Sequence, residues 1–206
     1  SSYNLLLLAE NMTGYQNLLT RPSAAQLEAF YYYPRIDHDF LAAHSEGLIC
    51  TSGCMSAEIP CALLKENPDE AVRRMNWYYD VFGKDRFFVE LQHHNIKEIT
   101  KLNKDLLDLG ARYQAKYVAT NDVHYINQSD AQLQDVLLAI QTNSLLSDKD
   151  RMTMTDDSYY LRTAAEMSQL FAEVPESLSN TLLIAERCNV DLGFKGYHLP
   201  DFTVPE

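Results

Sequence analysis

The chain lacks any hydrophobic run long enough to cross a membrane, and it opens on no secretory signal. The apolar stretch from Leu5 to Ala9 is far shorter than the roughly 20 residues of a transmembrane helix. There is also no low-complexity tract and no internal repeat. The sequence is therefore not expected to cross a membrane or to form a repeat array, and we expect a cytoplasmic protein.

Positive charge is scarce as well. Lys and Arg number 17 against 29 Asp and Glu, which gives a formal net charge of −12 at pH 7 and an isoelectric point near 4.8. Such an acidic chain repels a phosphate backbone. Non-specific binding of nucleic acid by this chain alone is therefore not expected.

The cysteines form no Cys-x-x-Cys pair, which excludes a zinc ribbon. They are Cys50, Cys54, Cys61 and Cys188. Without an export signal, we expect them to be reduced thiols. The length of 206 residues suits one domain, or one with an appendage. The chain begins at Ser1 without a methionine and stops just after a loop, so we expect both ends to be cuts in a longer polypeptide.

Short apolar stretches alternate with amphipathic ones along the first two thirds of the chain. The expected strands are Tyr3–Ala9, Gly47–Thr51, Arg86–Leu91 and Tyr117–Ala119. Helices are expected to begin at Asp37, Asn67 and Ser129, the last as a capping box with Gln132. This alternation predicts an α/β fold with parallel strands and right-handed crossovers.

The pattern changes after Thr142, where the chain becomes polar and then helical. Thr163 and Glu166 form a capping box, and a further helix is expected from Pro175 to about Cys188. We therefore divide the chain into an α/β part, residues 1–145, and a helical extension, residues 146–206. The predicted inward-facing residues of the last two long helices are Leu133, Val136, Leu137, Ile140, Leu178, Leu182 and Ala185.

The sequence Thr120-Asn121-Asp122-Val123-His124 follows a buried-type strand. In extended chain Asp122 and His124 point to one side, where a carboxylate and an imidazole can bind the same Zn²⁺ or Mn²⁺. The alternative is a capped turn in which His124 bonds to a carbonyl group. The position of Asp122 and His124 favours the metal interpretation, because α/β folds build their binding sites at the carboxyl ends of strands.

Two more stretches occupy equivalent positions. Cys54 follows the second strand beside Gly53, where it is either a thiolate ligand or a small core residue. The third strand ends with Glu90, Gln92 and two adjacent histidines, His93 and His94. Adjacent side chains on a strand point in opposite directions, so at most one histidine faces a site.

Together these stretches resemble one family, the polymerase-and-histidinol-phosphatase (PHP) domain of the alpha subunit of bacterial DNA polymerase III. The resemblance covers essentially the whole chain, in the order of the family. It is carried by residues 11–18 (NMTGYQNL), 46–54 (EGLICTSGC), 88–92 (FVELQ), 119–125 (ATNDVHY), 164–171 (AAEMSQLF) and 185–190 (AERCNV).

The resemblance implies a distorted (β/α)7 barrel with up to three metal ions at the carboxyl ends of its strands. Members with all ligands are linked to Zn²⁺- or Mn²⁺-dependent phosphoester cleavage, including 3′-5′ exonuclease action. Of the ligand positions, Cys54, Asp122 and His124 match. Asn4 stands where the family has histidine, and an amide oxygen is a weak ligand for zinc.

The family's first ligands, which begin with a His-x-His motif, have no counterpart before Ser1. The polymerase palm is likewise expected beyond Glu206. We therefore expect part of a PHP barrel that neither polymerises nor hydrolyses DNA and holds at most one ion weakly. Lacking its first strands, it is expected to self-associate or to close up differently.

The resemblance also implies partners, namely other domains of the same polymerase chain and a separate proofreading exonuclease subunit. Contact with DNA would be made by the parent protein and not by this acidic chain alone. One alternative is a docking platform for the exonuclease whose metal site has decayed, which Asn4 favours. Another is a free-standing phosphoesterase of the histidinol phosphatase type, which the helical part after Thr142 disfavours.

Overall fold

A four-stranded sheet lies at the centre of the computed structural model, which describes residues 2–27, 35–154, 156–193 and 196. The strand order is β1-β2-β3-β4. The strands are β1 (Leu7–Ala9), β2 (Leu48–Thr51), β3 (Phe87–Gln92) and β4 (Lys116–Thr120). β2, β3 and β4 are parallel, as predicted. The prediction is wrong for β1, which runs antiparallel to β2.

The reversed direction of β1 follows from the path of the chain after it. Ala9 at the end of β1 pairs with Leu48 at the start of β2, and the Glu10 amide donates to the Gly47 carbonyl over 2.9 Å. The intervening chain therefore returns to the same end of the sheet instead of crossing its face. An apolar run fixes that a strand is buried but carries no information about its direction.

Eight helices are described in these ranges. They are α1 (Met12–Leu27), α2 (His38–Ala43), α3 (Glu58–Leu64), α4 (Pro68–Arg86), α5 (Lys97–Ala111), α6 (Ala131–Gln141), α7 (Ala164–Leu170) and α8 (Glu176–Arg187). The predicted caps are confirmed at Asp37, Asn67 and Thr163, whose side chains accept bonds from backbone amides. None of the described helices is long and apolar enough to span a membrane.

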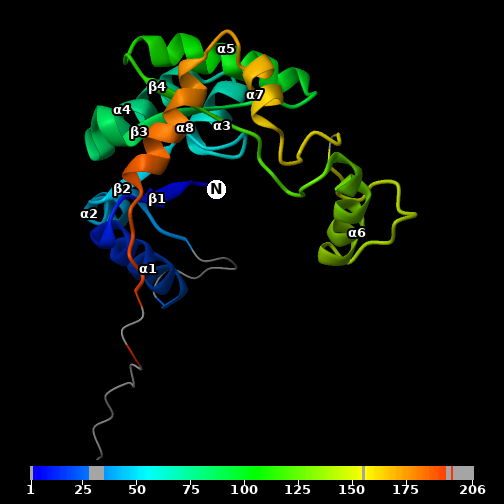
Figure 1. The fold of residues 1–206 in the computed structure, drawn as a ribbon, viewed down its shortest axis with the longest axis horizontal. Coiled ribbons are helices and arrows are strands. Elements are labelled where there is room, and N and C mark those ends of the chain that lie inside the picture. The colour runs from blue at the N-terminus through cyan, green and yellow to red at the C-terminus, as the bar shows by residue number, and fades with distance from the viewer. Residues whose placement is uncertain (1, 28–34, 155, 194–195, 197–206) are drawn as a thin grey trace, which may run out of the picture.

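Helices α3, α4 and α5 cover one face of the sheet (Figure 1). The crossovers β2–α3–α4–β3 and β3–α5–β4 place them there, as expected for parallel strands. The main hydrophobic core lies between these helices and the sheet. Its fully or nearly fully buried members include Leu48, Cys50, Ile59, Met75, Phe82, Phe87, Val89 and Leu106.

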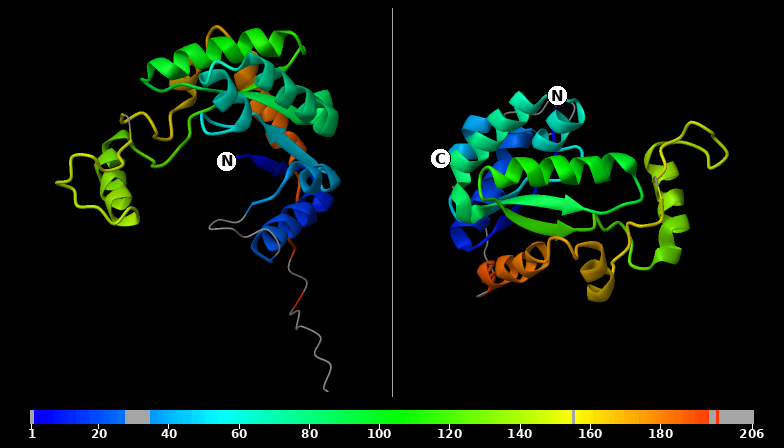
Figure 2. Two further views of the ribbon diagram at one scale, coloured as in Figure 1. Left: turned by 180° about the vertical axis from the view of Figure 1, so that it is seen from behind. Right: turned by 90° about the horizontal axis from the view of Figure 1, so that it is seen from above.

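The opposite face is covered by α8, which packs along β4 (Figure 2). Ile184 lies there against Ile49, Phe88 and Val118. The predicted inward face of α8 is confirmed at Leu178, which is partly buried against the core, but it is wrong at Leu182, which is 67% exposed, and at Ala185, which is also exposed. The small Ser177 is fully buried on this helix, and its hydroxyl donates to the Val174 carbonyl (2.7 Å).

Helix α6 projects away from the sheet (Figure 1), and its predicted core face is solvent-exposed. Leu133, Val136, Leu137 and Ile140 are 40–71% exposed, whereas Leu138 is buried. The predicted capping box is also displaced: it is formed by Asn127 and Asp130 around a 3₁₀ turn (Gln128–Asp130). Periodicity identified the apolar face of this helix but not whether anything packs on it.

Candidate functional site

A cleft of about 380 Å³ opens at the carboxyl ends of β2, β3 and β4. This is the sheet edge at which α/β folds place ligands. It is lined by Asn4, Leu5, Leu6, Gly53, Cys54, Glu90, Gln92, Thr120, Asn121, Asp122 and Val123. Three of the four predicted metal ligands, Asn4, Cys54 and Asp122, thus share one cleft, while the fourth, His124, is absent from the lining.

Glu90 at the end of β3 is the buried centre of the cleft, with only 5% exposure. Its carboxylate accepts hydrogen bonds from the hydroxyls of Thr51 (2.5 Å) and Thr120 (2.6 Å) and from the amide of Gln92 (3.0 Å). These donors come from all three parallel strands. The hydrogen bonds to this buried carboxylate join the ends of the three strands.

Cys54 and Asn4 meet at Ser56. The Asn4 side-chain amide donates to the Ser56 hydroxyl (2.8 Å), which also lies 3.0 Å from the Cys54 sulfur. The turn that carries Cys54 contains Gly53, whose φ of +74° lies in the left-handed region that favours glycine. The thiol is therefore a partly exposed group at the rim of the cleft, not a core residue.

Asp122 and His124 do not share the extended conformation that the sequence predicted. Asp122 has a φ of +45°, in the left-handed region, so the rule that residues two apart face one side does not apply. The His124 imidazole Nδ1 lies 2.6 Å from the Asp122 carbonyl oxygen, and the ring edge contacts Tyr159. This agrees with the alternative of a turn in which His124 bonds to a carbonyl.

The side chains described here do not fit a metal centre. Within the described ranges, no three His, Cys, Asp or Glu residues lie close enough together to bind one ion. Asn4 turns its amide NH₂ group to Ser56 and Glu90 is engaged by three donors. The assignment of Asn4, Cys54, Asp122 and His124 as ligands of Zn²⁺ or Mn²⁺ stays a prediction.

Only one of the two adjacent histidines faces inward. His94 is 3% exposed and stacks on Tyr159 with ring centroids 3.9 Å apart, while His93 is exposed. The Ser158 hydroxyl donates its single hydrogen to Asp156 (2.5 Å). It therefore acts as the acceptor in its hydrogen bond with His94 Nδ1 (2.7 Å). His94 Nε2 is buried without a hydrogen-bond partner. Burial lowers the pKa of His94 below its usual value and keeps the ring neutral.

Asn121 holds a distant segment beside the cleft, a role that the sequence did not indicate. Its amide NH₂ group donates to the carbonyls of Ser158 (2.9 Å) and Tyr160 (2.7 Å), and its oxygen accepts from Arg162 (3.1 Å). The signal available in the sequence was a polar residue directly after a strand, but its partners lie 37 to 41 positions away.

Comparisons with known proteins identify sequences similar to this chain. The family model of the PHP domain matches residues 1–94. Proteins named DNA polymerase III subunit alpha are 42% identical over 203 residues in Treponema pallidum (strain Nichols) and 42% identical over 210 residues in Thermus aquaticus. These matches cover 98% and 99% of this chain. The chain spans only 17% of the length of either relative.

Proposed function

Since the chain belongs to the family of DNA polymerase III alpha subunits, with a PHP domain in its first part, we propose that it forms one segment of a DNA-directed DNA polymerase in DNA replication. The observation that carries this proposal is the unbroken similarity to these relatives over almost the whole chain. In this proposal, polymerase activity is a property of a longer polypeptide, of which the relatives are examples.

Within that polypeptide we propose a structural role for this segment. The buried network around Glu90 uses its polar groups to join strand ends, and the described residues offer no three-ligand metal centre. The PHP family generally binds metal ions, so metal-dependent 3′-5′ exonuclease action is the alternative. It would need ligands beyond Cys54, Asp122 and His124.

The parallel strands β2, β3 and β4, with α3, α4 and α5 on one face, correspond to a part of the distorted PHP barrel from whose other face α8 is displaced, with residues 146–206 as an extension toward the palm. We propose that α6 provides the contact to another domain of the same polypeptide. Most of the large apolar side chains that are exposed in the described residues lie between 123 and 161. Exposed apolar patches of this kind mark interaction surfaces. A separate proofreading exonuclease subunit is the alternative occupant.

The polymerase proposal is tested on the native source. An antibody against this chain should detect a polypeptide several times larger than 23.6 kDa, and that polypeptide should co-purify with primer-extension activity. A band of only 23.6 kDa without such activity would overturn the proposal and favour a free-standing phosphoesterase of the histidinol phosphatase type.

The structural role needs a separate test. The purified 206-residue chain, supplied with Zn²⁺ or Mn²⁺, should retain at most one loosely held ion and leave single-stranded DNA intact. Two or more tightly held ions by elemental analysis, or release of nucleotides from the 3′ end, would contradict it. A Cys54→Ser, His124→Ala double variant is the control, because it removes two of the four predicted ligands.

A further inference from the structure

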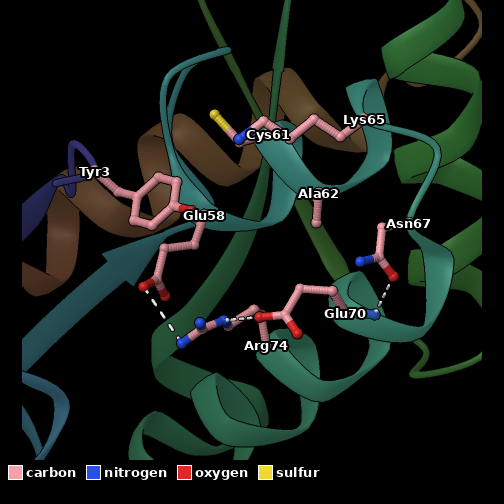
Figure 3. A pocket seen from close by; sticks show the side chains of 8 residues that line it. All are labelled: Tyr3, Glu58, Cys61, Ala62, Lys65, Asn67, Glu70 and Arg74. Carbon is pink, nitrogen blue, oxygen red and sulfur yellow. Dashed lines mark hydrogen bonds and ion pairs between the residues drawn. The ribbon is translucent and has the colours of Figure 1, made fainter. Parts of the chain in front are cut away.

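A second cavity, of about 250 Å³, lies between α3 and α4 and shares no residue with the cleft at the strand ends. Figure 3 shows its lining side chains, which come from the N-terminal segment, α3, the turn after it and α4. They are Tyr3, Glu58, Cys61, Ala62, Lys65, Asn67, Glu70 and Arg74. Apart from the helix cap at Asn67, none of these residues has a role in the predicted metal site or in the proposed function.

One wall of the cavity is an ion network in which the carboxylates already have partners (Figure 3). Arg74 Nε donates to Glu70 (2.6 Å), and Arg74 Nη1 lies 3.5 Å from Glu58. Glu58 also accepts from the Tyr78 hydroxyl (3.1 Å), and Glu70 also pairs with Arg73. The acceptor side of the lining is therefore occupied.

The unused polar groups of the lining are donors. The Asn67 side-chain oxygen caps α4 by accepting from the Glu70 amide (3.1 Å), which leaves its NH₂ group available. The lining groups with no hydrogen-bond partner among the described residues are the Tyr3 hydroxyl, the Lys65 ammonium, the Asn67 NH₂ group and Arg74 Nη2. A site whose unpaired groups can all donate, and whose carboxylates already have partners, suits an anion.

The negative charges of the lining are compensated. Two cations, Lys65 and Arg74, balance two carboxylates, Glu58 and Glu70, and Arg73 pairs with Glu70 from outside the lining, in a chain whose net charge is −12. Guanidinium and ammonium groups bind phosphate and carboxylate oxygens strongly. A volume of 250 Å³ is below the roughly 300–1,000 Å³ of pockets for larger ligands.

We propose that this cavity binds a small oxyanion, either phosphate or a carboxylate. The anion sits between Lys65 and Arg74 and accepts from the Asn67 NH₂ group and the Tyr3 hydroxyl. The proposal does not depend on the polymerase assignment.

The test is a titration of the full 206-residue chain with sodium phosphate or sodium acetate at constant ionic strength, followed by amide NMR. We expect saturable shifts at residues 58–74 and not at the cleft. The decisive variant is Asn67→Asp, because aspartate keeps the helix cap while a negative oxygen replaces the NH₂ group. It should weaken binding at least about tenfold, the size of one lost charge-assisted hydrogen bond, with an unchanged melting temperature.

Lys65→Ala should weaken binding similarly, whereas Lys84→Ala, which removes a positive charge bonded to Gln114 outside the cavity, should not. If Asn67→Asp unfolds, Asn67→Ser keeps a capping oxygen and still lacks the NH₂ group. Tighter binding of phosphate or of acetate identifies which oxyanion the cavity prefers. Absence of saturation with both anions, undiminished binding by the Asn67 variants, or an equal loss in Lys84→Ala would overturn the proposal.

Discussion

The guanidinium of Arg187 lies 2.6 Å from the carboxylate of Glu10, although 177 positions separate the two residues. Their side chains are 24% and 18% exposed, and the pair joins the end of α8 to the end of β1. Arg187 also donates to the Asp85 carbonyl (2.5 Å), just before β3. One side chain thus links three parts of the fold.

Arg187→Ala should lower the free energy of unfolding by about 1–3 kcal/mol, because it leaves a half-buried carboxylate and a carbonyl without their donor. Urea denaturation measures the change. The matched control is Arg73→Ala, which breaks the exposed pair with Glu70 and should cost less than about 1 kcal/mol. Equal losses in both variants would contradict the role of Arg187.

Glu90→Ala should destabilise the chain by roughly 2–4 kcal/mol, since three donors on three strands lose their common acceptor in a buried site. Thermal unfolding followed by circular dichroism measures this. Glu98→Ala on the first turn of α5 is the exposed control. A Glu90 variant as stable as the parent would show that water replaces the carboxylate without loss.

His94 makes stability depend on pH. Its pKa is lowered in the folded state, so the unfolded chain binds a proton first as the pH falls. The stability present above the ordinary histidine pKa of about 6.5 is therefore lost progressively below it. In His94→Gln the decline between pH 6.5 and 5 should flatten, whereas His93→Gln, at the exposed neighbour, should keep it. The measurement is chemical denaturation across this range.

Two adjacent leucines on α6 test whether its apolar face is free. Leu138 is 8% exposed and Leu137 is 58% exposed. Leu138→Ala should cost about 2 kcal/mol or more, and Leu137→Ala less than about 0.5 kcal/mol. If Leu137→Ala proves as costly in the isolated chain, its side chain is already covered there, for example by a second copy, and light scattering would detect the association.

Local signals predicted the local structure well. Asn67 followed by Pro68 specified the start of α4, and Thr163 with Glu166 specified that of α7, because caps act within one helical turn. The three parallel strands were predicted for a similar reason, since each is a short buried run between helices.

Features that depend on residues far apart in the chain could not be predicted from the sequence. The direction of β1 depends on where Leu48 lies, and the partners of Asn121 lie in a segment tens of residues away. Asn4, Cys54 and Asp122 line one cleft and His124 does not, and their assignment as metal ligands stays a prediction. That prediction assumed extended backbone at Asp122, and a single left-handed residue changes where the following side chains point.

Helix α8 occupies the face of the sheet that a closed barrel would enclose. The interior of a small barrel is filled by side chains from its own strands, with no room for a helix. Extra strands added at the edges of this sheet therefore cannot complete a cylinder while Ile184 rests on Phe88 and Val118. Ring closure and the docked helix exclude each other, so any longer polypeptide with a complete barrel must first displace α8.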